Sequence, residues 1–172
     1  VANALAAIAV GLACGLRLEE IGAGLEAVQP TAGRLAAAVS PAGATVIDDC
    51  YNANPGSVSA AIDMLASCEG RRTLVLGAMR ELGPTSEALH RDIGAYARAA
   101  GLDRFWGVGP ELQCAVDSFG PGGRWFADCG AAIDAIGHEF GAADTVLVKG
   151  SRSARMERVL HALLAAEPAG ES

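Results

Sequence analysis

Short apolar segments alternate with longer helical segments over most of this chain, and this alternation constrains the fold more than any other feature. The apolar segments are continuous, which is typical of strands buried on both faces of a parallel sheet. Strands that alternate with helices favour βαβ units with right-handed crossovers. We therefore predict a Rossmann-like, doubly wound α/β domain with a mostly parallel sheet and helices on both faces. The predicted strands are residues 72–76, 104–108, 124–126 and 145–148, and the predicted helices are residues 57–67, 86–100, 111–118, 131–140 and 154–166.

The first 31 residues have a different pattern. Two Ala- and Leu-rich segments, 1–14 and 18–28, predict a pair of helices, and the chain opens within a helical pattern, as a piece of a longer protein would. A Gln-Pro-Thr-Ala-Gly segment at residues 29–33 then breaks the pattern. We expect a domain boundary here, with residues 1–31 in one part and residues 32–172 in the α/β domain. That domain should open with two paired strands, at 35–40 and 44–47, because a Pro-Ala-Gly turn joins them.

The composition excludes several functional classes. The formal net charge of −7 argues against a nucleic-acid partner, because phosphate binding needs a clustered basic surface. No apolar run reaches the ~18 residues of a membrane span. The five cysteines are scattered without a CxxC pair and the three histidines are not clustered, so neither a zinc site nor a disulfide framework is indicated. We interpret the cysteines as reduced thiols of a cytoplasmic protein.

Polar clusters follow the predicted strands, where an open α/β sheet binds its ligand. They are residues 48–54, 77–83, 107–109 and 149–155. The first reads Asp-Asp-Cys-Tyr-Asn-Ala-Asn, which is costly to bury and forms helix or strand poorly. The GxG at 107–109 lacks the third glycine of a dinucleotide fingerprint, and no GxxxxGK[ST] loop occurs in the chain. An ordinary turn is therefore the better interpretation of 107–109.

The cluster Lys-Gly-Ser-Arg-Ser at residues 149–153 contains the only lysine of the chain. It follows a strand and opens a predicted helix, where backbone N–H groups and a glycine would bind carboxylate or phosphate. The alternative is that Ser153 only caps the helix and the charges are solvated. Arg34, at the boundary, is either a hinge arginine on the surface or a guanidinium that grips a phosphate across a cleft. We interpret His90, His138, His161 and Cys50 as structural residues.

Five sequence pieces, taken in order, resemble the carboxyl-terminal part of a Mur ligase. They are Asn-Ala-Leu-Ala-Ala at 3–7, Gly-Arg at 33–34, Asp-Asp-Cys-Tyr-Asn-Ala-Asn-Pro at 48–55, Leu-Gly-Ala-Met-Arg-Glu-Leu-Gly at 76–83 and Leu-Val-Lys-Gly-Ser-Arg-Ser at 147–153, the last followed by Met-Glu at 156–157. The resemblance covers nearly the whole chain. The pieces at 51–55 and 148–152 are typical of the family member that joins D-alanyl-D-alanine to UDP-N-acetylmuramoyl-tripeptide in peptidoglycan synthesis.

The resemblance implies a cytoplasmic, ADP-forming ligase of three domains. Residues 1–31 would be the last helices of the central ATPase domain, and residues 32–172 the terminal Rossmann-like domain. In the implied reaction, ATP and Mg²⁺ convert the tripeptide carboxylate into an acyl phosphate, and the amine of the dipeptide attacks it. The nucleotide-binding lysine loop, the Mg²⁺ carboxylate and the modified lysine would lie upstream of residue 1. The chain alone should therefore be inactive, with the protein's own upstream domains as its partners.

The resemblance also implies roles for particular residues. Asn3 would contact adenine, Arg34 the ATP phosphates and Asp49 the ribose, while Tyr51, Asn52 and Asn54 would line the interdomain cleft. The residues assigned to the dipeptide are Met79, Lys149, Ser151, Arg152 and Ser153. No catalytic or metal-binding residue is assigned within the chain.

Two positions depart from the family pattern: Cys50 stands where serine is common, and Ala78 stands where aspartate is frequent. The second departure puts any role of a carboxylate at that position in doubt. Two alternatives stay open at this point. One is another Mur-like amide ligase of the folylpolyglutamate or cyanophycin synthetase type, and the other is a non-catalytic α/β binding module.

Overall fold

The computed structural model describes residues 2–28, 33–137 and 139–166 of the chain. The chain divides into two compact units, Val1–Pro30 and Thr31–Ser172. The first unit contains two helices, α1 (Ala2–Ala13) and α2 (Leu18–Glu26). They pack closely, because a Cβ atom added at Gly11 would lie 2.8 Å from the buried Ile21 side chain. Both helices agree with the sequence prediction to within two residues.

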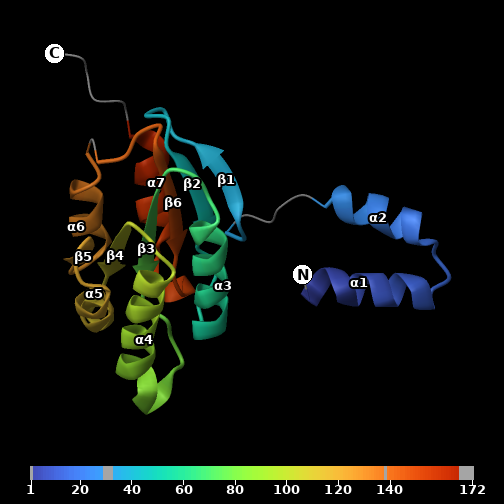
Figure 1. Ribbon diagram of the computed structural model, residues 1–172, viewed down its shortest axis with the longest axis horizontal. Coiled ribbons are helices and arrows are strands. Elements are labelled where there is room, and N and C mark those ends of the chain that lie inside the picture. Colours follow the sequence, from blue (N-terminus) through green and yellow to red (C-terminus); the bar gives the residue numbers. More distant parts are fainter. Residues whose placement is uncertain (1, 29–32, 138, 167–172) are drawn as a thin grey trace. The chain divides into compact units, whose positions relative to one another are not determined.

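The second unit is a six-stranded sheet in the order β1-β2-β6-β3-β4-β5 (Figure 1). Strand β1 is antiparallel to β2, and the other neighbouring pairs are parallel. The strands are β1 (Ala36–Val39), β2 (Thr45–Asp49), β3 (Arg71–Gly77), β4 (Arg104–Val108), β5 (Gly123–Phe126) and β6 (Asp144–Lys149). The helices are α3 (Pro55–Ala66), α4 (Ser86–Ala99), α5 (Gln113–Phe119), α6 (Cys129–Asp134) and α7 (Glu157–Ala165). This is the predicted doubly wound, mostly parallel α/β fold, opened by the predicted hairpin.

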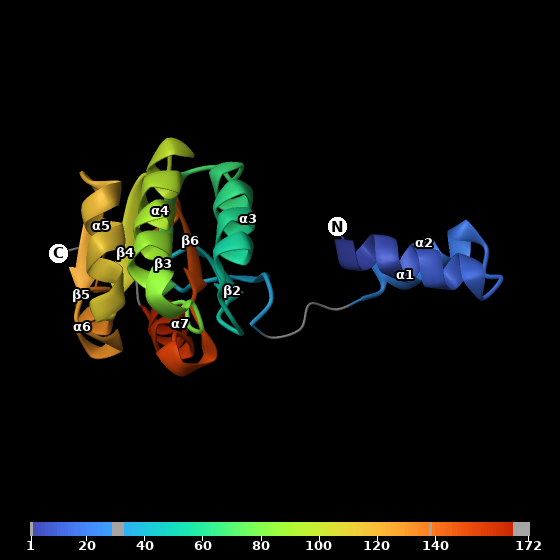
Figure 2. The ribbon, with the colours of Figure 1, turned by 90° about the horizontal axis from the view of Figure 1, so that it is seen from below.

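Helices cover both faces of this sheet (Figure 2). Helices α3, α4 and α5 share one apolar core with alternate strand residues such as Leu74 and Leu76. Helices α6 and α7 share a second core with the intervening residues, among them Val75. Successive side chains of a strand point to opposite faces, so a strand that is buried on both faces must be apolar throughout. The continuous apolar segments in the sequence have this physical cause.

Two predicted helices have different limits in the structure. Helix α6 begins at Cys129 rather than at 131, because Asp128 caps it by accepting from Ala131 N at 3.0 Å, and it ends at Asp134 rather than at 140. Helix α7 begins at Glu157 rather than at 154. Before it lies a short 3₁₀ helix, η3 (Arg152–Ala154), and Arg155 after it has a left-handed φ of 52° that separates the two. The prediction that residues 149–153 open an α-helix was therefore wrong.

Candidate functional site

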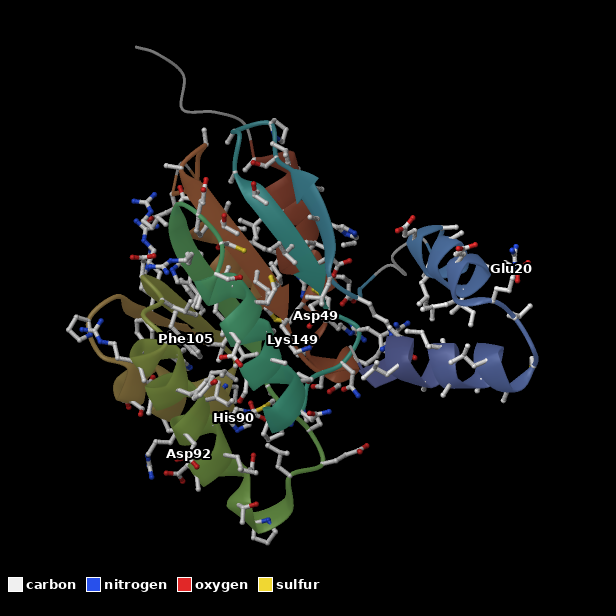
Figure 3. The ribbon with its side chains drawn as sticks, turned by 45° about the vertical axis from the view of Figure 1, so that its right-hand side comes forward. Glu20, Asp49, His90, Asp92, Phe105 and Lys149 are labelled. Carbon is white, nitrogen blue, oxygen red and sulfur yellow. The ribbon has the colours of Figure 1, made fainter. Side chains whose placement is uncertain are left out.

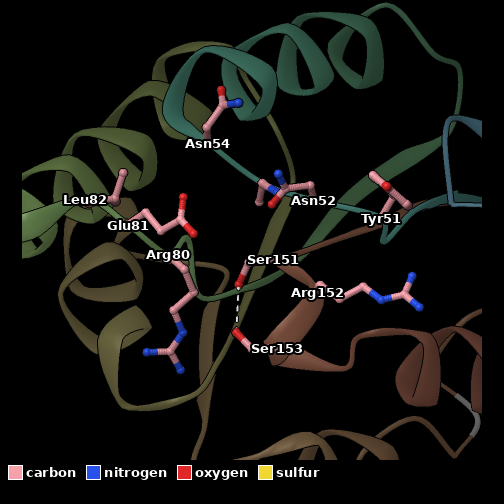
Figure 4. A pocket seen from close by; sticks show the side chains of 10 residues that line it. Tyr51, Asn52, Asn54, Arg80, Glu81, Leu82, Ser151, Arg152 and Ser153 are labelled. Carbon is pink, nitrogen blue, oxygen red and sulfur yellow. Dashed lines mark hydrogen bonds between the residues drawn. The ribbon is translucent and has the colours of Figure 1, made fainter.

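The carboxyl ends of β2, β6 and β3 lie side by side, because β6 pairs with both of the other strands. Strands β2 and β3 lead into α3 and α4 on one face of the sheet, whereas β6 leads into α7 on the other face. Such a switch in direction opens a crevice at the carboxyl edge of an α/β sheet. A cavity of about 630 Å³ lies there (Figure 4). It is lined by residues 51–54 after β2, 80–82 after β3 and 151–153 after β6.

Three of the four polar clusters predicted from the sequence thus meet at one cavity. The fourth, at 107–109, is not among the residues that line it in the described part of the chain. A Cβ atom added at Gly107 would lie 2.7 Å from the Val116 side chain and 2.8 Å from Leu112, so this glycine allows η2 (Pro110–Leu112) and α5 to pack on β4. A structural turn remains the interpretation of that segment.

The Asp48 carboxylate organises the loop after β2. One of its oxygens accepts from Gly33 N at 2.8 Å and the other from Cys50 N at 3.0 Å. Tyr51 N in turn donates to Gly33 O at 3.1 Å. Asp48 therefore ties the segment that carries Arg34 to the loop that carries Tyr51. The sequence analysis did not select Asp48 as a functional residue, although its place at the end of a predicted strand pointed to it.

Two guanidinium groups lie near the half-exposed Tyr51 ring. Arg34 Cζ is 4.3 Å and Arg152 Cζ is 5.9 Å from the ring centroid, within the range of a cation–π contact. Tyr51 and Arg152 also line a second, smaller hollow of about 270 Å³, together with Gly33, Glu157 and His161. These contacts bring Arg34, which was predicted for the nucleotide, and Arg152, which was predicted for the dipeptide, to the same aromatic ring.

The two asparagines of the loop satisfy backbone groups. Asn52 Oδ1 accepts from Ala53 N at 2.8 Å. Asn54 is the N-cap of α3: its Oδ1 accepts from Ser57 N at 2.9 Å, and Ser57 Oγ accepts from Asn54 N at 3.1 Å. This reciprocal pair of bonds is a capping box, and Pro55 follows it in the first turn, where its missing N–H costs nothing. The Asn54 carboxamide oxygen is thus committed to the start of the helix, although the exposed residue also lines the cavity.

Asp49 and Lys149 form a buried ion pair between the ends of β2 and β6 (Figure 3). Lys149 Nζ donates to Asp49 Oδ2 at 2.5 Å and to Asn52 O at 2.9 Å. Burial raises the pKa of the Asp49 carboxyl above its ordinary value, although the hydrogen bond and the charge of Lys149 oppose this rise. Lys149 is only 2% exposed and is absent from the described lining of the cavity. Its predicted contact with the dipeptide is corrected, because its ammonium group is used inside the fold.

Ser151 is likewise used inside the fold. Its hydroxyl donates to Ala78 O at 2.6 Å and its N–H donates to the same oxygen at 3.1 Å. Arg152 and Ser153, by contrast, are exposed at the edge of the cavity (Figure 4). An anion that binds at this turn would meet the two exposed side chains and the start of η3 rather than the start of an α-helix.

The loop after β3 contributes residues that the sequence analysis missed. Met79 was predicted to contact substrate, but its side chain is 2% exposed and packs in the core beneath α4. The cavity is lined instead by the next three residues, Arg80, Glu81 and Leu82. Arg80 also pairs with Glu111 at 2.7 Å. The sequence did contain a signal for these residues, namely two adjacent charged side chains at 80–81 in a loop bounded by Gly77 and Gly83.

Asn3 lies on α1 in the first unit and is exposed. Because Asn3 belongs to the first unit and the cavity residues belong to the second, its assignment to adenine stays a prediction. His138 lies outside the described residues. Among residues 2–28, 33–137 and 139–166, no group of three or more His, Cys, Asp or Glu side chains could hold a metal ion. None of the helices described there is both long enough and apolar enough to cross a membrane.

The fold is a Rossmann-like α/β domain, and its cavity lies at the carboxyl edge of the sheet, where domains of this class bind their ligands. Residues 33–152 match the family described as Mur ligase, glutamate ligase domain. The chain therefore belongs to the Mur ligase family.

Several relatives match nearly the whole chain. The UDP-N-acetylmuramoyl-tripeptide–D-alanyl-D-alanine ligase of Escherichia coli is 43% identical over 165 residues, which are 95% of this chain and 36% of that protein. The enzyme of the same name from Haemophilus influenzae is 38% identical. A crystal structure of MurF from Acinetobacter baumannii superposes with a TM-score of 0.84 at 34% identity, covering 94% of this chain and 36% of that one. The chain thus spans little more than a third of the relatives that it matches.

Proposed function

We propose that this chain is the carboxyl-terminal part of an ATP-dependent ligase that joins D-alanyl-D-alanine to UDP-N-acetylmuramoyl-tripeptide in peptidoglycan synthesis. The observation that carries the proposal is the cavity at the ends of β2, β6 and β3, built from the same segments that resemble this member of the family. The identity of 43% to the Escherichia coli ligase extends over 95% of the chain and supports it. As the part that lacks the upstream domains, the chain alone would be inactive.

The chemistry of the cavity suits a dipeptide with a carboxylate at one end and an amine at the other. Arg80 and Arg152 supply guanidinium groups, and Ser153 supplies a hydroxyl, for the carboxylate. Glu81 supplies a carboxylate that would accept from the amine. The negative charge of Glu81 on the loop after β3 and the positive charge of Arg152 on the turn after β6 favour one orientation of a dipolar ligand. The role of this part of the ligase would be to bind the dipeptide and orient its amine toward the activated tripeptide.

The nucleotide would lie on the side of Arg34 and Asp49. Arg34 has an exposed guanidinium, which fits a phosphate, and Asp49 is partly buried with one oxygen paired to Lys149, which leaves its other oxygen for a ribose hydroxyl. Asn52 and Asn54 would line the same cleft, and Asn3 would contact adenine. ATP and Mg²⁺ would be held mostly by the upstream ATPase domain. A solved MurF ligase from Thermotoga maritima, which is 26% identical with a TM-score of 0.78, is in complex with ADP.

The two-helix unit would belong to that upstream domain. We place the boundary at residues 31 and 32, as predicted from the sequence. Six large apolar side chains in this unit are about half or more exposed: Leu5, Val10, Leu12, Leu16, Leu18 and Val28. Water-exposed apolar side chains at this density are typical of a surface that packs against another part of a protein. The assembled ligase would act in the cytoplasm, where its nucleotide substrates are found.

The test is phosphate release by the full-length protein with ATP, UDP-N-acetylmuramoyl-tripeptide and either D-alanyl-D-alanine or a single amino acid. Release that requires the dipeptide supports the proposal. Release with glutamate on a folate or peptide acceptor would instead favour the other Mur-like ligases. Absence of any ATP-dependent release would favour a non-catalytic binding module.

Arg152→Ala sharpens the test. It should raise the KM for the dipeptide by about tenfold or more, because a charge-assisted hydrogen bond contributes ~1.5–3 kcal/mol, while the KM for ATP changes less. Arg158→Ala is the matched control, since Arg158 is an exposed arginine on α7 outside the described cavity lining. Equal effects of the two substitutions would remove Arg152 from the dipeptide site.

A further inference from the structure

One peptide group between β3 and the cavity is held from two sides. Its oxygen, Ala78 O, accepts from both the N–H and the hydroxyl of Ser151. Its nitrogen, Met79 N, donates to His90 Nε2 at 3.0 Å. The two partners come from different elements: Ser151 follows β6, and His90 lies in α4. Both polar ends of the Ala78–Met79 peptide group, the C=O and the N–H, are therefore held by hydrogen bonds.

The surroundings of His90 are those of a specific hydrogen-bond acceptor rather than of a side chain that only fills space in the core. Its side chain has no exposure to solvent. Its other ring nitrogen, Nδ1, lies 2.8 Å from Ser86 O, which can only accept, so we assign the ring proton to Nδ1. Nε2 is then left as the acceptor that Met79 N–H requires. Both ring nitrogens are used, which is the condition for burying a neutral imidazole without penalty.

The held peptide group immediately precedes the three residues of this loop that line the cavity. Glu81, in their middle, has a left-handed φ of 63°, a conformation that costs free energy for a residue with a Cβ atom. Such a conformation persists only when the surrounding structure enforces it. Two contacts hold the backbone near Glu81. One is the fixed Ala78–Met79 peptide group, which precedes the loop 80–82, and the other is the Arg80–Glu111 ion pair, which is formed from within the loop.

We propose that His90 and Ser151 are positioning residues that hold the Ala78–Met79 peptide group from opposite sides and thereby fix the dipeptide-binding loop 80–82 against the turn 151–153. The identity of the ligand rests on the proposed function, whereas the anchoring itself does not. Ser151 is assigned a new role by this inference. Its hydroxyl hydrogen is committed to Ala78 O, so donation to a substrate carboxylate falls to Arg152 and Ser153.

The first experiment measures anchoring directly, by amide hydrogen exchange in the 172-residue chain. His90→Leu removes the acceptor, whereas the side-chain oxygen of His90→Gln can still accept from Met79 N. The Met79 amide should exchange roughly five to thirty times faster in the Leu variant, the factor that corresponds to one lost hydrogen bond, and less fast in the Gln variant. The amides of Leu74 and Leu147, in neighbouring core strands, serve as the reference for global unfolding.

An unchanged Met79 exchange rate in the Leu variant would overturn the proposal. A parallel acceleration at Met79, Leu74 and Leu147 would also overturn it, because His90 would then support the whole core rather than this loop. If the Leu variant does not fold, the comparison of the Gln variant with Ser151→Ala decides. In that case the proposal requires faster exchange at Met79 in Ser151→Ala than in the Gln variant, and the reverse order contradicts it.

The second experiment uses the full-length ligase. His90→Leu and Ser151→Ala should each raise the KM for the dipeptide by roughly five- to thirtyfold and change the KM for ATP by less than about twofold. Because both residues act through one peptide group, the double variant should show less than the product of the two single effects. Ser67→Ala is the matched control, since the Ser67 hydroxyl also donates to a backbone oxygen at 2.6 Å but lies at the C-cap of α3, the opposite end of that helix from the cavity residue Asn54.

Multiplicative effects in the double variant would show that the two residues act independently, and would overturn the shared anchor. Faster exchange at Met79 with an unchanged KM for the dipeptide would overturn the role of the loop in substrate binding. If the unaltered ligase releases no phosphate with D-alanyl-D-alanine, the proposed function fails, and the exchange rates still decide whether His90 holds the loop.

Discussion

Replacing Lys149 with methionine should weaken the fold strongly and in a pH-dependent manner. The substitution keeps an unbranched apolar stem of similar length but removes the ammonium group. Asp49 then loses its partner, and Asn52 O loses its donor. The Lys149 side chain is 3% exposed and the Asp49 side chain is 14% exposed, so water cannot fully replace the lost contacts.

The magnitude follows from this burial. Removing one partner of a buried ion pair costs about 3–5 kcal/mol, because an uncompensated charge is left behind. The partial exposure of Asp49 places the expected value near the lower limit, and the carbonyl of Asn52 adds about 1 kcal/mol. We expect a loss of about 3–4 kcal/mol in the free energy of unfolding, or a Tm lower by about 6–16 °C for a chain of this size.

The pH dependence provides a second check on the cause. Burial already raises the folded-state pKa of Asp49 above its ordinary value of 3.8, and loss of the lysine should raise it further. A carboxyl with a raised folded pKa contributes stability that is present below the unfolded pKa and is lost as the pH rises through the folded pKa. The deficit of the Met variant should therefore be largest at neutral pH and should shrink toward pH 4.

Urea unfolding of the chain, followed by circular dichroism between pH 4 and pH 7, measures both effects. Adding Asp49→Asn to the Met variant removes the unpaired charge and should recover part of the lost stability at neutral pH. A deficit below about 1 kcal/mol, the range of an exposed ion pair, would refute the reasoning. So would a deficit that is the same at every pH, because the buried carboxylate would then not be its cause.

Two further substitutions test the frame of the site. Gly33→Ala should lower the free energy of unfolding more than Gly101→Ala. Both glycines have φ near 80°, so the backbone strain is similar. An added Cβ atom at Gly33 would lie 3.1 Å from Tyr51, whereas none of the described atoms lies within 4 Å of one added at Gly101. Thermal melts compare the two variants, and equal losses would mean that the contact with Tyr51 carries no cost. Asp144→Asn should lower the free energy of unfolding at neutral pH by about 2–3 kcal/mol, because Asp144 is buried and bonds Arg71 at 2.6 Å. Burial raises the pKa of Asp144, but its hydrogen bonds, that from Arg71 foremost, outweigh the effect of burial and lower the pKa below 3.8. The parent chain should therefore lose this stability as the pH falls through the lowered pKa. Urea titrations should show a weaker loss of stability at acid pH in the Asn variant than in the parent chain.

Most of the fold could be predicted from the sequence, because burial on two faces requires continuous apolar strands and the helices between them follow from the same alternation. The limits that failed were those set by contacts outside the local pattern. Arg155 interrupts the predicted last helix with a left-handed conformation. Asp128 starts α6 two residues early through a cap, a signal that the sequence contained but that the apolar pattern concealed.

The segments that line the cavity were predicted in outline, since the loops after β2, β3 and β6 were all selected. Individual residues were harder to assign. Met79 and Lys149 were expected at the ligand, yet the first packs in the core and the second forms an internal ion pair. Arg80 and Asp48 were not selected, although one lines the cavity and the other fixes its frame.

The sequence by itself determined which segments are strands and helices, and which polar clusters follow the strands, because these properties depend on local periodicity. Only the tertiary structure decided that β6 lies between β2 and β3, which brings Asp49 beside Lys149, one hundred residues later. The tertiary structure also decided which polar groups form hydrogen bonds or ion pairs inside the fold and which are exposed at the cavity. A side chain such as Ser151 has the same chemistry in either role, and its partner, Ala78 O, belongs to a loop 73 residues away. Long-range packing alone fixes that choice.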